Sequence, residues 1–432
     1  MATTEREILP GIRLRVIETD RFKTCSFSAA FLCPLDARFA SANALVPRVL
    51  RRGCARLPDM TQIARELEEL YGAVIEPFAR KQGDVQVVGL VCDFVDGQYA
   101  EDSQMFKRMC NLAAELLLDP VLEDNVFRKE YVESERANLL DELRAEQNEK
   151  LQYAYRQALS KLFEGQSFGV SATGDEAHAK QITRDSLQKA YARLVETAPL
   201  LLTYCGSESF ETVAEITQDV FAPLSRAVVN EATPSAPTVQ SETIECVDVM
   251  DVNQTVLLLG MQAGQADRWA MEVLATVLGG GTASKLFLNV RERESLCYYT
   301  GTVYDRNQDT MFLYAGIDAA QTRRAIENML EEYRACAAGR ITEEELVQAK
   351  YRLVDRLKTI KDSPTSLLFY WIDRMAVGEI RTPSETARAL HAVMREQVIE
   401  AADACELKIL YRLTGEEGNC GDRNYLPETQ RT

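Results

Sequence analysis

The two halves of the chain end alike, each with a helical segment followed by a short apolar strand and a glycine. Residues 183–207 have this pattern and include the strand Leu200 to Gly206, and residues 394–415 repeat it with a strand that ends at Gly415. The two glycines lie about half a chain apart, so we interpret the sequence as a diverged tandem repeat of one α+β unit.

The rest of the chain alternates between extended and helical patterns. Residues 11–19 and 24–32 alternate apolar with polar side chains, which predicts half-buried strands, and 73–95 return to this character. Helical spacing is found over 61–72 and through most of 101–163. This alternation is typical of an α+β fold.

The length of 432 residues exceeds what a single core supports, so two domains are expected. Residues 224–241 are small and polar, with two prolines, and are the best linker. We therefore predict an N-terminal domain over 1–223 and a C-terminal domain over 242–432. The tail 416–432 is polar, and its order cannot be judged from the sequence.

The charge balance excludes whole classes of partner. With 49 Lys and Arg against 66 Asp and Glu, the net charge is −17, which repels nucleic-acid phosphates and acidic membrane surfaces. We find no apolar run of 18 residues and no basic-then-apolar leader. We expect a cytoplasmic protein that binds neither nucleic acid nor membrane.

The histidine count is the strongest constraint on chemistry. His178 and His391 are the two histidines of the chain, and they lie in separate halves. Zinc hydrolases commonly need two or three imidazoles, often two on one helix. The eleven cysteines include no C-x-x-C pair, so neither a zinc knuckle nor a redox dithiol is indicated.

The most specific motif lies in the second half, at Gly279-Gly280-Gly281 between two predicted helices. It is followed by Ser284-Lys-Leu-Phe, then by Arg291-Glu292, and then by Leu296-Cys-Tyr298. A glycine triplet allows a sharp turn and a close backbone approach, although a plain helix C-cap is an equally good interpretation. A phosphate loop is excluded because the G-x-x-x-x-G-K-[ST] pattern is absent.

Taken together, this run of motifs resembles the C-terminal half of insulinase/pitrilysin-type metallopeptidases, which include the mitochondrial processing peptidases. Four segments of the first half also look like this family: residues 11–14, 53–71, 135–143 and 171–174. The resemblance implies two homologous α+β domains of the processing-peptidase type. Each is expected to be an antiparallel-rich sheet with helices on one face, and the two to face each other as a clam-shell.

Enzymes of this family carry an H-x-x-E-H zinc motif on a helix of the first half. Counted back from Gly53, the matching positions here are Ala44, Pro47 and Arg48. Neither imidazole is present, nor is the catalytic Glu, and a fixed cation at 48 would repel Zn²⁺. The resemblance thus implies a degenerate zinc motif and no metal in this chain.

The family's later glutamate helix is retained in part. Glu135 and Glu142 lie seven residues apart, so both carboxylates fall on one helix face. One interpretation is two solvated acids on a charged helix, and another is a relic ligand helix without metal. A third is an unusual Mn²⁺ or Mg²⁺ site that also uses Asp141.

The resemblance also assigns roles to Arg291 and Tyr298. In the family this pair faces the zinc, where the Tyr hydroxyl donates to the developing oxyanion and the Arg steadies a substrate carbonyl. The glycine triplet would help bind substrate. Alternatively, Arg291 pairs with Glu292 or Glu294 at the surface and Tyr298 packs in a core. Ser295 departs from the family, which usually has glycine there.

The first hypothesis for function is a zinc-less subunit of a heterodimeric insulinase-type peptidase, inactive alone. Arg291 and Tyr298 would act in trans on a peptide bound at the zinc of a homologous partner that carries H-x-x-E-H. The alternative is a non-catalytic binding or assembly protein of the same fold, such as the bacterial type associated with 5-aminopentanol modification of elongation factor P. The sequence identifies neither the partner nor the peptide, and leaves homo- or hetero-oligomerisation open.

Overall fold

The computed structural model describes residues 2–224, 226, 229–230, 234–235, 238–262, 264, 266–416 and 425. They form two compact units: unit 1 comprises Met1–Ala145, Val170–Ser235 and Ile360–Ile380, and unit 2 comprises Glu146–Gly169, Ala236–Thr359 and Arg381–Thr432. Much of the predicted linker 224–241 and nearly all of the tail 416–432 lie outside the described residues. The predicted boundaries at 223 and 242 stay a prediction.

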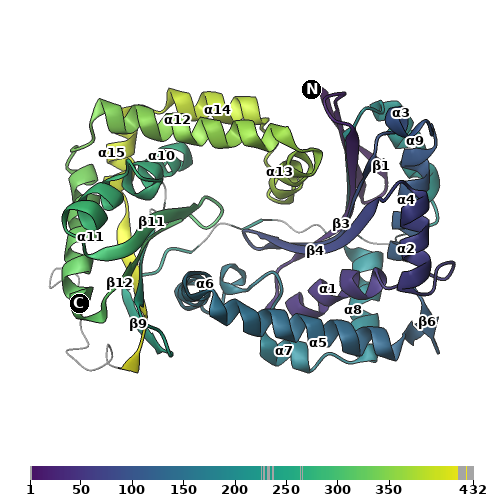
Figure 1. Ribbon diagram of the computed structural model, residues 1–432, viewed down its shortest axis with the longest axis horizontal. Coiled ribbons are helices and arrows are strands. Elements are labelled where there is room, and N and C mark those ends of the chain that lie inside the picture. Colours follow the sequence, from purple (N-terminus) through teal and green to yellow (C-terminus); the bar gives the residue numbers. More distant parts are fainter. Residues whose placement is uncertain are drawn as a thin grey trace. The chain divides into compact units, whose positions relative to one another are not determined.

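Unit 1 contains a mixed six-stranded sheet with the order β1-β2-β8-β3-β5-β4 (Figure 1). Strands β2 and β8 run parallel, and the other neighbours run antiparallel. The strands are β1 (Ala2–Leu9), β2 (Ile12–Glu18), β3 (Thr24–Pro34), β4 (Val74–Gln82), β5 (Val85–Val95) and β8 (Leu200–Gly206).

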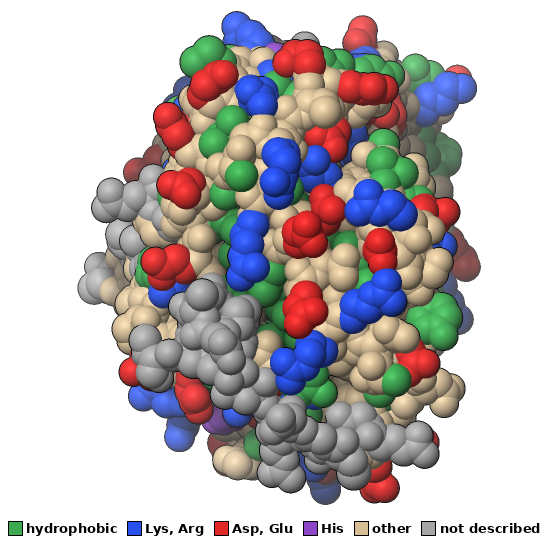
Figure 2. Space-filling model, turned by 90° about the vertical axis from the view of Figure 1, so that its left-hand side faces the viewer, with side chains coloured by type: hydrophobic (Ala, Val, Ile, Leu, Met, Phe, Trp, Pro, Cys, Tyr) green, Lys and Arg blue, Asp and Glu red, His purple; other side chains and the backbone are tan. Residues whose placement is uncertain are grey.

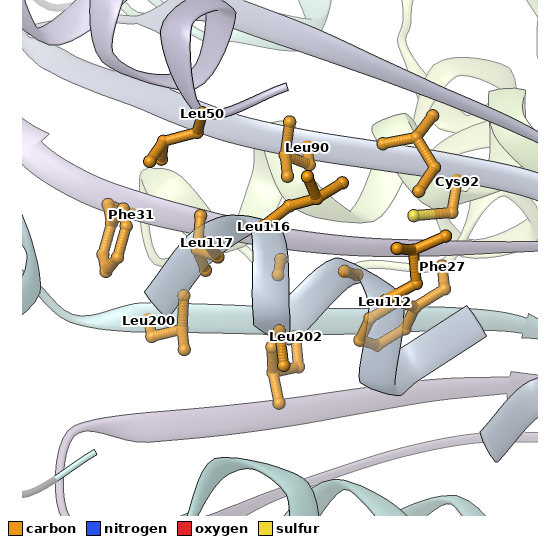
Figure 3. Packing of buried hydrophobic residues seen from close by; sticks show 14 of the residues in the cluster. Phe27, Phe31, Leu50, Leu90, Cys92, Leu112, Leu116, Leu117, Leu200 and Leu202 are labelled. Carbon is orange, nitrogen blue, oxygen red and sulfur yellow. The ribbon is translucent and has the colours of Figure 1, made fainter. Parts of the chain in front are cut away.

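The main core of unit 1 lies between one face of this sheet and a layer of helices. Alternate residues of β3 and β8, such as Phe31 and Leu202, face Leu116 and Leu117 of the helix α4 (Figure 3). The helices and short strands of this unit are α1 (Ala37–Leu50), α2 (Met60–Glu69), α3 (Gly97–Ala100), α4 (Met105–Leu118), β6 (Leu122–Glu123), β7 (Val126–Phe127), α5 (Lys129–Ala145), α7 (Glu176–Lys180), α8 (Arg184–Thr197) and α9 (Phe210–Phe221).

Unit 2 repeats the design with five strands in the order β11-β12-β10-β13-β9. Its last two neighbours, β13 and β9, are parallel, as β8 and β2 are. The strands are β9 (Ile244–Val249), β10 (Thr255–Gln262), β11 (Cys297–Asp305), β12 (Thr310–Ile317) and β13 (Glu406–Thr414). Five strands of each sheet therefore follow the same order, which supports the predicted tandem repeat and two-domain α+β fold.

The helices of unit 2 cover one sheet face and build a second core around residues such as Leu259, Leu274 and Leu330. They are α10 (Arg268–Gly279), α11 (Thr322–Ala337), α12 (Glu343–Thr359), α14 (Pro383–Ala392) and α15 (Arg395–Asp403), with the eight-residue π-helix η3 (Leu286–Arg293) before β11. Four 3₁₀ turns complete the described elements: η1 (Glu146–Asn148), η2 (Ser167–Gly169), η4 (Ala319–Gln321) and η5 (Ile360–Asp362). No described helix is both long and apolar enough for a bilayer crossing.

The opposite face of each sheet is covered by a helix from the other half of the sequence. In unit 1, α13 (Pro364–Ala376) packs Leu368 and Ile372 against Ala30 and Leu201 of the sheet. In unit 2, α6 (Lys150–Leu162) buries Ala154, Ala158 and Leu162 against Leu258, Ile409 and Tyr411. Each repeat thus supplies one helix to the second face of the other repeat's sheet, an exchange that the sequence patterns do not indicate.

Candidate functional site

The helix α1 holds the positions where a zinc motif was expected. Its N-cap is Asp36, whose side chain accepts a hydrogen bond from the backbone N–H of Arg38 at 2.9 Å. Ala44 is 1% exposed and Pro47 is buried in the middle of the helix. Pro47 has no N–H to donate to the carbonyl four residues earlier, yet α1 extends to Leu50, and the N–H of Arg51 donates to the Pro47 carbonyl at 3.0 Å.

Arg48 is bound by one of the predicted relic carboxylates. Its Nη1 and Nη2 donate to Oε1 and Oε2 of Glu142 at 2.7 and 2.6 Å, a bidentate pair between α1 and α5. The hydrogen bonds to Glu142 raise the pKa of Arg48 above its ordinary value, so the guanidinium stays charged. The side chains are 19% and 56% exposed.

Glu135, seven residues before Glu142 on the same face of α5, is also bound by an arginine. Arg52, four residues after Arg48, donates from Nε to Oε1 of Glu135 at 2.6 Å and from Nη2 to Ser134 Oγ at 2.7 Å. The Glu135 side chain is 13% exposed. This differs from the expectation of two solvated acids, because both carboxylates are engaged by arginines and one of them is largely buried.

The residues at this place do not fit the zinc ion that enzymes carrying the H-x-x-E-H motif hold there. The retained carboxylate of Glu142 already has a cation bonded to both oxygens, and Ala44 and Pro47 offer no donor atoms. Within the described part of the chain, no three His, Cys, Asp or Glu side chains are grouped so that they could hold a metal. The guanidinium of Arg48 supplies the positive charge that a metal would bring.

Sequence reasoning missed Arg52, although the chain contained a signal for it. Arg48 lies in the last turn of α1 and Arg52 in the turn that follows it, and the two glutamates lie seven residues apart on one face of α5. Two arginine–glutamate pairs between these segments were therefore foreseeable in outline. Which helix met which was not, because that depends on contacts between segments far apart in the sequence.

Tyr298 lies at a β-bulge on an edge strand of unit 2. β11 pairs with β12, and the register shifts between Cys297 and Tyr299, so Tyr298 is the extra residue of the bulge. Its side chain is 59% exposed, whereas that of Cys297 is 9% exposed. The alternative that Tyr298 packs in a core is wrong. The preceding Ser295 adopts φ 52°, a left-handed conformation that favours glycine, which accounts for the family's usual residue there.

Arg291 belongs to the π-helix η3, a rare conformation that is frequent at functional sites. Its guanidinium carbon lies 4.6 Å from the centre of the Phe287 ring, and its Nε lies 3.9 Å from Oε1 of Glu292. The side chain is 40% exposed. The surface pairing with Glu292 that we considered is therefore present, but at a distance that leaves the guanidinium donors free of a close carboxylate among the described residues.

The three glycines have different structural duties. A Cβ on Gly279 would lie 2.4 Å from the backbone N of Thr302, so the end of α10 packs directly on β11. Gly280 and Gly281 line a pocket of about 320 Å³, with Arg352 and Tyr351 of α12 on its other side. The structure thus gives Gly279 a packing reason, and places Gly280 and Gly281 at an open pocket.

Comparisons with known proteins agree with the class of protein that these features suggest, namely two sheets with five strands in the same order, a helix without zinc ligands and an Arg/Tyr segment. The family model described as "Peptidase M16 inactive domain" matches residues 181–353. These findings confirm the predicted resemblance to this family. The match to an inactive domain also supports the prediction that it is not a peptidase by itself.

Individual relatives agree with this class. The chain is 25% identical to the "Probable inactive metalloprotease YmfF" of Bacillus subtilis (strain 168), over 94% of this chain and 97% of that protein. It is 26% identical to the "Uncharacterized zinc protease Rv2782c" of Mycobacterium tuberculosis, over 74% of each. Among solved structures, a conserved protein from Enterococcus faecalis V583 shares the fold with a TM-score of 0.88 and 22% identity, over 96% of this chain and 99% of that one. A "peptidase M16 inactive domain" from Pseudomonas fluorescens gives 0.77 and 16% over 96% and 98%.

Proposed function

We propose that this M16-type chain is the zinc-less subunit of a two-chain peptidase. It binds an extended peptide and presents Arg291 and Tyr298 to that peptide, while zinc and the H-x-x-E-H motif belong to a homologous partner subunit. The observation that carries the proposal is the exposure of Tyr298, which is 59% exposed at a bulge that directly follows the buried Cys297.

The side chain of Tyr298 contributes little to the stability of the fold. Its hydroxyl makes no hydrogen bond with a described residue, and the ring covers little of the core beneath it. A bulge re-aims the side chain that it carries, and bulges are enriched beside active sites. A phenol held outward on a rigid strand is a donor that can meet a substrate oxygen without rearranging.

The neighbouring elements suit an extended peptide. β11 has β12 as its single partner among the described strands, so its outer edge offers backbone N–H and C=O groups to a further strand. Arg291 directs a guanidinium from the element just before this edge, stacked on Phe287 rather than tied to a close carboxylate. Because Gly279 has no side chain, the end of α10 packs closely on β11 and holds this edge strand in position.

The ion pairs of unit 1 support the assignment of the zinc site to a partner subunit. The Arg48–Glu142 and Arg52–Glu135 ion pairs occupy the carboxylates that a metal at this position would need. A chain of this kind needs a metal-bearing partner if it takes part in amide hydrolysis at all. We therefore assign the metal to a second, homologous subunit.

The test is reconstitution with an H-x-x-E-H homologue from the same genome, assayed on an unfolded peptide. We expect activity from the complex and none from this chain alone. Tyr298→Phe in the complex should lower kcat about 100-fold, as the loss of one oxyanion donor does. Tyr99→Phe, at a tyrosine of unit 1 that is 54% exposed, is the matched control and should change nothing.

Two results would contradict the proposal. Full activity of the Tyr298→Phe complex would make the Arg/Tyr segment architectural and favour a binding or assembly protein. Chelator-sensitive hydrolysis by the purified single chain would show that it carries its own metal site.

A further inference from the structure

Unit 1 contains a second feature, which is unrelated to the zinc position and to the Arg/Tyr segment. It is a pocket of about 520 Å³ between α1, α7 and α8. Arg38, His178, Lys189 and Arg193 line it, and its lining, which consists of described residues, includes no Asp or Glu. Arg38, Lys189 and Arg193 therefore give this pocket a positively charged lining in a chain of net charge −17. By contrast, Lys and Arg are interspersed with Asp and Glu on the face shown in Figure 2.

Arg193 is the centre of the pocket's charge. It is half-buried, and its guanidinium carbon lies 3.7 Å from the centre of the Phe39 ring. Its Nη2 donates to Oδ1 of Asn43 at 2.8 Å, and Asn43 in turn donates to the buried Gln86 at 2.9 Å. No carboxylate of the described chain forms an ion pair with Arg193. A partly buried cation is usually paired, so this one is positioned for a partner that the chain does not supply.

The acidic groups around the pocket are already engaged. Asp36 acts on Arg193 through space, but both of its oxygens bond Arg38 at 2.6 to 3.1 Å, and one also caps α1. Asp175 caps α7 and bonds Nδ1 of His178 at 2.7 Å. The free donors are therefore the remaining N–H groups of Arg193 and the ammonium of Lys189.

We propose that this pocket binds a small molecule bearing an oxyanion, either a carboxylate or a phosphate, with an apolar part. The oxyanion would bond Arg193 and Lys189, because a guanidinium fork and an ammonium both recognise such oxygens. The apolar part would lie against Phe39 and Ile182, which line the same pocket. The inference depends neither on a partner subunit nor on a peptide substrate.

Binding can be measured by calorimetry with benzoate and phenyl phosphate, using benzyl alcohol as the uncharged control. We expect binding of at least one anionic probe in the millimolar range, typical of small ligands with one anchored charge, and none of benzyl alcohol. Arg193→Gln should weaken binding about tenfold or more, because it removes a charge-assisted bond. Lys189→Gln, at an exposed position, should weaken it about threefold.

Lys107→Gln removes the same charge from the exposed surface of α4 and is the matched control, which should bind as the unmodified chain does. Preference for benzoate or for phenyl phosphate would support the pocket and assign the oxyanion. Binding unchanged by both Lys189→Gln and Arg193→Gln would overturn the proposal, as would the absence of binding of either anionic probe up to ~10 mM. Lys189→Gln keeps the test valid if Arg193→Gln fails to fold.

Discussion

Units 1 and 2 share the order of five strands, but Arg48 and Arg52 of unit 1 differ from Arg291 of unit 2 in how closely they are paired with carboxylates. In unit 1, Arg48 and Arg52 each hold a glutamate of α5 at 2.6 to 2.7 Å. In unit 2, Arg291 lies 3.9 Å from its nearest carboxylate partner and Tyr298 is 59% exposed. Arg48 and Arg52 are thus paired within the fold, whereas Arg291 has no close carboxylate among the described residues. One repeat of a fold can thus pair its arginines internally while the other leaves an arginine with free donors.

Zinc ligands introduced into unit 1 should replace the Arg48–Glu142 ion pair by a metal site. Ala44→His together with Arg48→His places two imidazoles one helical turn apart and frees Glu142 as a third ligand. We expect the bound zinc, measured by plasma mass spectrometry, to rise from none to about one per chain. At a zinc concentration ~1,000 times the Kd the chain should gain about 4 kcal/mol against unfolding.

Arg48→Ala is the control for this experiment, since it removes the cation without adding a ligand and should bind no zinc. If the double variant also binds none, Glu142 does not stand where a third ligand would be useful, and the relic interpretation of α5 fails.

The two arginine pairs of unit 1 differ in burial, and their loss should differ accordingly. Arg52→Ala leaves the Glu135 carboxylate, 13% exposed, without its cation, and should cost about 3 kcal/mol of unfolding free energy in urea titrations. Arg48→Ala leaves Glu142, 56% exposed, to be solvated, and should cost about 1 kcal/mol. Equal losses would contradict the burial argument, and Glu135→Gln in the Arg52→Ala background should recover part of the larger loss.

Gly279→Ala tests whether the glycine triplet is held by packing. The added methyl group would lie 2.4 Å from the backbone N of Thr302, where no flexible side chain can yield. We expect a loss of about 2 kcal/mol in thermal or urea unfolding. If the free energy of unfolding of Gly279→Ala were unchanged, Gly279 would not be required for packing, and substrate binding would remain as the explanation for it.

Ser295→Gly should give the smallest effect, and it should be stabilising. Glycine removes the strain of φ 52° but gains freedom in the unfolded chain, so the net gain is about 0.5 kcal/mol. Ser295→Val, with a branched side chain at the same φ, should instead lose about 1 kcal/mol or more. A destabilised Ser295→Gly would mean that the serine side chain itself supports the segment between η3 and β11.

Local elements were predictable because they depend on local patterns. The alternation over 11–19 corresponds to β2, Ile12–Glu18, and the helical spacing over 61–72 corresponds to α2, Met60–Glu69. The repeated ending is present as α8 with β8 and α15 with β13. Chain length and the repeated ending predicted two domains, and the resemblance to a family supplied their architecture, which periodicity alone does not.

What escaped prediction depends on contacts between distant segments. The apolar stripe of a helix such as α6 or α13 says that it will be buried, but not on which sheet. The same holds for Arg52 and Glu135, which meet across 83 positions of sequence. Ser295 was visible as a departure from the family, but its meaning required the backbone angle.

The helix exchange means that neither repeat contains all the layers of its own unit. A fragment ending near residue 223 would keep α6 and lack α13, so the second face of its sheet would be left bare while a surplus amphipathic helix stayed unplaced. The linker region therefore joins two pieces that are mutually dependent rather than two autonomous modules. A single ancestral repeat would satisfy the same requirement only as a dimer that swaps one arm, and joining the two copies into one polypeptide makes that swap permanent.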